Sequence, residues 1–65
     1  MNNLTNHQRM MINAIRTGQK DARIDSASDA STYGARPNSS WELWYKWGRD
    51  GLPMPAELTS KGVTA

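Results

Sequence analysis

The side chains that most often carry catalysis or bind metals are scarce in this chain of 65 residues. It has no cysteine and one histidine, His7, so disulfides and thiolate chemistry are excluded and a zinc site made by the protein alone is disfavoured. No serine or carboxylate stands at a helical offset from His7 that would build a catalytic triad, and no Gly-x-x-x-x-Gly-Lys phosphate loop is present. We therefore expect no enzyme activity, no metal and no cofactor, with His7 at the surface near the start of a helix.

Three carboxylates repeat every four residues, at Asp21, Asp25 and Asp29, a spacing that could align them on one face of a helix. Residues 25–31, however, are small polar side chains and alanine, which favour turns and caps over regular structure. We therefore interpret the carboxylates as solvated residues of a connector.

Four cations recur at steps of seven, four and three residues: Arg9, Arg16, Lys20 and Arg23. At about 100° per residue they fall on one face of a helix, and they give residues 1–24 a net charge of +3 when the whole chain carries +2. Like charges at this spacing repel one another, and their electrostatic energy becomes favourable only when an anion faces them. A phosphate backbone is the commonest such anion. Two interpretations stay open, a solvated surface and a contact with nucleic acid.

Three tryptophans fall within seven residues: Trp41, Trp44 and Trp47. Each indole can bury on the order of 200 Å², more than two helices can cover for all three. One interpretation packs two of them against Met11, Ile15 and Ala22 as a core and leaves the third half covered. The others are a symmetric dimer seam, a docking site for a protein, and a platform on which an unpaired base stacks.

A first helix over about residues 6–24 would position the cations. Thr5 and Gln8 have the spacing of a capping box at its start, and no proline interrupts the range. Its apolar stripe lies opposite the cations and consists of Leu4, Met11, Ala14, Ile15, Gly18 and Ala22.

A second helix over about residues 40–50 would position the tryptophans. Ser39 and Glu42 form another capping-box pair, and Gly51, Leu52 and Pro53 supply a stop in which Leu52 folds back onto Trp47. The residues that follow the rhythm of a core are Trp41, Trp44, Tyr45 and Gly48. Residues 25–38 between the two helices read as an irregular connector without a strand, since Gly34 permits positive φ and Pro37 favours extended geometry before it.

The predicted fold is all-α, a two-helix hairpin with an irregular connector in one small domain, residues 1–58. Pro55 can open one more turn over residues 56–58, and residues 59–65 read as a flexible tail with nothing to bury.

Only 24 residues are apolar and seven of these are alanine, so a homodimer or another bound partner is the remaining way to complete the core. No apolar run exceeds three residues, which predicts a soluble cytoplasmic protein with no membrane partner.

Over residues 14–51 the chain resembles the ribosome modulation factor family of very small bacterial and phage proteins. The resemblance is carried by these residues: Gly18, Ala22, Tyr33, Trp44, Trp47, Arg49 and Asp50. The chain departs from the family where Ser31 and Thr32 replace a Cys-Pro pair and where Trp47-Gly48 replaces a Gly-Trp step, and a small indel separates Tyr33 from the tryptophans.

The resemblance implies a two-helix protein with an ordered connector that binds 16S ribosomal RNA near the messenger exit region and promotes pairing of inactive ribosomes. Gly18 and Ala22 would let the helices approach closely, Tyr33 would anchor the connector, and Trp44 and Trp47 would be structural. The four cations would then contact RNA, although the family motif does not itself specify them.

The function predicted first is therefore a small non-enzymatic RNA-binding protein of the ribosome that acts by occupancy through its basic helix face. The alternative is a phage-type accessory inhibitor that docks on a host protein through an exposed tryptophan face. An antibiotic-modifying kinase, as described for one relative in the same broad family, ranks last, because nothing in the chain suggests how it would hold a nucleotide.

Overall fold

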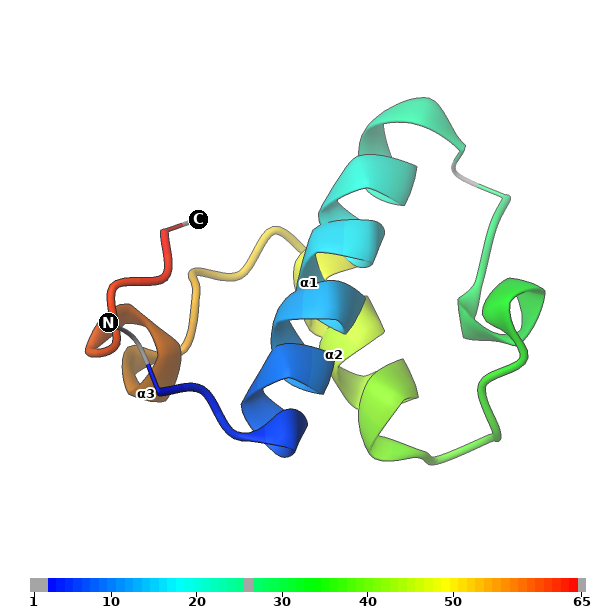
Figure 1. Ribbon diagram of the computed structural model, residues 1–65. Helices are drawn as coiled ribbons and strands as arrows, with labels where there is room; N and C mark the ends of the chain where they lie inside the picture. The colour runs from blue at the N-terminus through cyan, green and yellow to red at the C-terminus, as the bar shows by residue number, and fades with distance from the viewer. Residues whose placement is uncertain (1–2, 26, 65) are drawn as a thin grey trace.

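The computed structural model describes residues 3–25 and 27–64. Its elements are α1 (Asn6–Ile24), a short 3-10 helix η1 (Ala30–Tyr33), α2 (Ser40–Arg49) and α3 (Ala56–Thr59), with no strand in the described ranges. The all-helical prediction is confirmed. Figure 1 shows α1 and α2 crossing, the connector along one side of the pair, and α3 on the other side near the N-terminus.

Helix α1 begins with the predicted capping box. The Thr5 hydroxyl accepts a hydrogen bond from the Gln8 N–H at 3.0 Å, and the Gln8 side-chain oxygen accepts from the Thr5 N–H at 3.0 Å. Two of the free amides at the helix start are thereby satisfied locally. The helix ends where the Asp25 N–H donates to the Asp21 carbonyl at 2.9 Å.

Helix α2 begins with half of the predicted box. The Ser39 hydroxyl accepts from the Glu42 N–H at 3.2 Å, as expected for an N-cap. The Glu42 carboxylate, however, accepts from the N–H of Asn38 at 2.9 Å, one residue earlier than the box requires. Asn38 has a positive φ of 63°, and this turn brings its amide to the carboxylate.

The end of α2 is the predicted Schellman motif. Gly51 adopts a φ of 72°, which glycine tolerates without strain. Its N–H donates to the Gly48 carbonyl at 3.1 Å, and the Leu52 N–H donates to the Trp47 carbonyl at 3.3 Å. These two bonds define the motif and turn the chain toward α3.

The two long helices touch at a pair of glycines. A Cβ placed on Gly18 would collide with the Tyr45 carbonyl oxygen, and one placed on Gly48 would collide with the Ile15 carbonyl oxygen. The backbones therefore approach more closely at this crossing than any side chain would allow. Ala22, which was expected to share this role with Gly18, is exposed, so that part of the prediction is wrong.

The helices run in the same general direction, in contrast to the antiparallel order of a hairpin (Figure 1). Trp41 at the start of α2 lines a hollow with Asn13 and Thr17, and Arg49 at its end reaches the Asp25 carbonyl. The connector makes this order possible because it carries the chain back along the pair before α2 begins. It is more regular than predicted, since η1 is capped by Asp29, and its Ala30 is buried.

The core has two parts, and Trp44 packs against both of them. One consists of Ala14, Ala30 and Tyr45, with Trp41 and Ala35 packed against it. The other joins α1 to the C-terminal segment through Met11, Ile15, Met54 and Leu58, with Trp44, Trp47 and Val63 among the side chains packed against it.

The C-terminal segment therefore contributes to the core. The expectation that residues 59–65 have nothing to bury is wrong for Val63, which packs against the second part of the core. The Lys61 ammonium donates to the Asn3 carbonyl at 2.8 Å and to the Gln8 side-chain oxygen at 2.9 Å, which holds this segment to the start of α1. Ala65 lies outside the described residues.

Candidate nucleic-acid interface

The four predicted cations form one surface, here called the basic face: Arg9, Arg16, Lys20 and Arg23. All four are exposed on α1. At about 100° per residue they span an arc of roughly 60° centred almost opposite Gly18, which lies at the helix crossing. Within residues 3–25 and 27–64 no carboxylate forms an ion pair with the basic face, and Glu42 instead pairs with Lys46 at 3.8 Å.

The basic face lacks acidic neighbours because the one carboxylate of α1 points inward. Asp21 is only 4% exposed, in contrast to the solvated connector residue that its spacing suggested. Asp21 still belongs to α1, and because it lies three residues after Gly18 it falls on the same buried side of the helix. The negative charge of α1 thus lies on the buried side of the helix and forms no ion pair with the basic face, although Lys20 contributes at longer range to the lowered pKa of Asp21.

The Asp21 carboxylate is satisfied by two tyrosines. One oxygen accepts from the Tyr33 hydroxyl at 2.6 Å and from the Tyr45 hydroxyl at 2.8 Å. The hydrogen bond from Tyr33, followed by that from Tyr45, lowers the pKa of Asp21 below its ordinary value although burial opposes the shift. The same bond to Asp21 raises the pKa of Tyr33 to about 12.

Arg49 extends this group to the connector. Its guanidinium donates to the Tyr45 hydroxyl at 3.2 Å and to the backbone carbonyl of Ser28 at 2.5 Å. The hydrogen bond with Tyr45 is the main cause that raises the pKa of Arg49. Asp21, Tyr33, Tyr45 and Arg49, here called the latch, thus join α1, the connector and α2 through one set of polar contacts.

Among the tryptophans, Trp41 packs against one part of the core, Trp47 against the other, and Trp44 against both. Trp41 stacks on Tyr45 with ring centroids 5.3 Å apart and lies 5.5 Å from the ring of Tyr33. Trp44 and Trp47 meet edge to face at 5.4 Å, and the Trp47 indole N–H donates to the Pro53 carbonyl at 2.8 Å. All three indoles are half-buried, so each is partly packed in the fold and partly at the surface.

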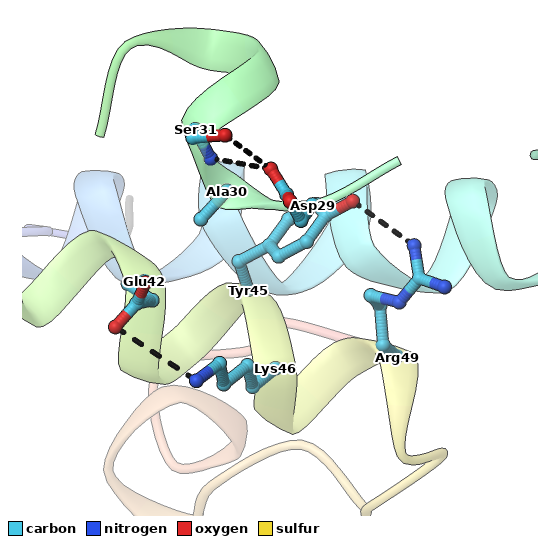
Figure 2. A pocket seen from close by; sticks show the side chains of 7 residues that line it. All are labelled: Asp29, Ala30, Ser31, Glu42, Tyr45, Lys46 and Arg49. Atoms are coloured by element: carbon cyan, nitrogen blue, oxygen red, sulfur yellow. Dashed lines mark hydrogen bonds and ion pairs between the residues drawn. The ribbon is translucent and has the colours of Figure 1, made fainter. Parts of the chain in front are cut away.

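A hollow of about 310 Å³ lies between η1 and α2 (Figure 2). The polar groups on its walls bind one another, since Asp29 accepts from the N–H and hydroxyl of Ser31 while Glu42 pairs with Lys46. Two carboxylates and two cations line it, so it offers no net charge to a ligand. Its walls are built to hold η1 against α2.

A second, larger hollow of about 530 Å³ borders the basic face. Its walls are formed by Asn13, Thr17, Tyr33, Gly34, Ala35 and Trp41. Asn13 and Thr17 stand three or four residues along α1 from Arg9, Arg16 and Lys20, which makes them neighbours on the helix surface. The hollow therefore combines exposed aromatic surface with adjacent positive charge.

No cluster of metal-ligating side chains is evident in the part of the chain that the structure describes. No three histidine or acidic side chains there lie close enough together to hold a metal ion. His7 is exposed in the first turn of α1, as predicted. Likewise, no helix within the described ranges is long and apolar enough to cross a membrane.

The structure thus brings together the four predicted cations on one face and places Tyr33 beside Trp41. The sequence reasoning missed Asp21, Tyr45 and Arg49 as a group. Their helical spacing could have indicated this group. Asp21 follows Gly18 by three residues and Arg49 follows Tyr45 by four, so each polar side chain lies next to a buried position on its helix. Comparison with known proteins adds no relative, because no family model, no curated protein and no solved structure matches the chain.

Proposed function

We propose that this protein binds RNA through the basic face of α1 and acts by occupancy without chemistry. The observation that supports this function is the set of four exposed cations with no paired carboxylate in the described ranges, on a helix whose own acid is buried. Repulsion along such a row is relieved when phosphates face it, and the release of counterions from the nucleic acid favours binding.

The ribosome, with its 16S RNA, is the target that we propose first. This choice comes from the resemblance to the ribosome modulation factor family. Gly18 at the helix crossing, Tyr33 bonded to α1, and Trp44 with Trp47 in the core occupy positions that suit the structural roles implied by that resemblance. They support the kinship of fold, and the basic face supplies the contact with RNA.

A protein inhibitor that docks through tryptophan has less support. Trp47 is occupied by its bond to Pro53 and its contact with Trp44, and Trp41 is stacked on Tyr45. Removal of any of these rings would first disturb the fold.

Charge reversal at two positions of the basic face tests the proposal. The double variant Arg16→Glu and Lys20→Glu should lose cosedimentation with bacterial ribosomes at low salt, because two phosphate contacts become repulsive. The matched control, Arg36→Glu with Lys46→Glu, makes the same change in net charge at two exposed cations outside the basic face and should retain binding. Circular dichroism should show equal helicity in all three proteins. Equal cosedimentation of the two double variants would contradict the proposal.

A further inference from the structure

The hollow beside the basic face has features that phosphate binding alone does not use. It is lined by two aromatic residues, Tyr33 and Trp41, by two polar residues, Asn13 and Thr17, and by Gly34 and Ala35. Its volume, about 530 Å³, is ample for one nucleobase with part of its sugar. From this juxtaposition we infer that the hollow receives one unpaired base of a single-stranded RNA whose phosphates lie on the basic face. The inference rests on the proposed function and narrows its substrate to RNA with an unpaired base.

The aromatic wall is suited to stacking. Tyr33 is 49% exposed although its hydroxyl is held by Asp21, so the ring is fixed in orientation and still presents surface to solvent. Trp41 lies against it and is itself stacked on buried Tyr45. A base that stacks on a fixed aromatic ring gains contact area at little cost in side-chain entropy, and every base has a face that can do so.

The polar wall is suited to a base edge. The Asn13 side chain is exposed and makes no hydrogen bond within residues 3–25 and 27–64, so its amide can both donate and accept. The Thr17 hydroxyl, by contrast, donates to the Asn13 carbonyl at 2.7 Å and is already engaged. Gly34 has a φ of 77°, and a Cβ there would meet nothing within 4 Å, so this part of the rim is open.

The adjacent charge favours RNA over an uncharged ligand. Arg9, Arg16 and Lys20 are the surface neighbours of Asn13 and Thr17 along α1. A base in the hollow would therefore place the phosphates on either side of it near these cations. A duplex could reach the same cations with its phosphates, but its paired and stacked bases could not enter the hollow.

Three RNAs distinguish the contribution of the hollow from that of the basic face: a short single strand, the same strand with one abasic ribose at its centre, and the corresponding duplex. The wild-type protein should bind the single strand roughly tenfold more tightly than the abasic strand, the change expected for loss of one stacked base. Thr17→Met, which fills the hollow with a flexible side chain, should bind the two strands equally. Asn13→Ala should show a smaller difference in affinity between the intact and the abasic strand, because it lacks the amide that contacts the edge of the base.

The matched control is Gln19→Ala, which removes an amide from the opposite flank of the basic face, away from the hollow, and should keep the wild-type preference. Wild-type protein that binds all three RNAs equally would overturn the inference and leave the proposed function intact. Binding of none of the three at low salt would overturn both. A preference for the single strand that persists in both Thr17→Met and Asn13→Ala would also overturn the inference, since the base would then stack elsewhere.

Discussion

At the scale of single residues, one buried carboxylate accounts for two properties of the protein. Asp21 receives both tyrosine hydroxyls and so ties the connector and α2 to α1. Because it is turned inward, it leaves the cations of the same helix without a surface counter-charge. The polar group that holds the fold together thus also shapes the electrostatics of the proposed RNA site.

The lowered pKa of Asp21 makes stability depend on pH in the acid range. Since the pKa of Asp21 is lower in the folded protein than its ordinary value of 3.8, its contribution is fully present above that value. The contribution is lost as pH falls through the pKa of the folded state. Urea unfolding of wild type and Asp21→Asn should show a stability difference at pH 7 that shrinks as the pH falls below about 4.

The lowered pKa of Asp29 does not confound this comparison, because Asp29 is present in both proteins. A stability difference between wild type and Asp21→Asn that stayed constant from neutral to strongly acid pH would contradict the role given to the Asp21 charge.

At the scale of elements, the crossing of α1 and α2 depends on the absence of two side chains. Each glycine faces the backbone of the other helix, which cannot swing away as a flexible side chain can. The packing of α2 on α1 at the crossing also determines which side of α1 faces away from the core. It therefore determines where the rings of Tyr33 and Trp41 lie relative to the basic face. A change at the crossing should therefore disturb both stability and RNA binding.

Gly18→Ala should destabilise the protein, although alanine is the better helix former by about 1 kcal/mol. Overpacking costs about 1–3 kcal/mol where neighbours can adjust, and here the neighbour is the Tyr45 carbonyl. Thermal unfolding should show a lower Tm for Gly18→Ala and an equal or higher Tm for Asn13→Ala, an exposed position on the same helix. A Tm for Gly18→Ala at or above that of wild type would show that the helices are not in backbone contact.

At the scale of the whole molecule, the sequence predicted what is local and missed what is distant. The sequence predicted the features that depend on neighbours within one helical turn. These are the ranges of α1 and α2, the capping box at Thr5 and the Schellman motif at Gly51. The direction of α2 relative to α1 depends on the path of the connector, which short polar residues do not specify. The packing of Val63 and the bond from Lys61 to the start of α1 join the two ends of the chain, and no periodicity signals them.

In the candidate site, too, the local features were predicted from the sequence and the contacts between distant segments were not. The alignment of the four cations is a property of one helix and was predicted from their spacing. The burial of Asp21 and its bonds to Tyr33 and Tyr45 require three segments to meet, so its spacing alone suggested a solvated residue. The hollow beside the basic face likewise exists only once the connector has folded back onto α1.

The contact between the basic face and RNA phosphates can be measured through the salt dependence of binding. Four phosphate contacts by the basic face predict that the logarithm of the association constant of the wild-type protein for single-stranded RNA falls with the logarithm of salt concentration with a slope of roughly −3. Binding that is unaffected by salt, or a slope that is the same in the Arg16→Glu and Lys20→Glu double variant, would contradict the account.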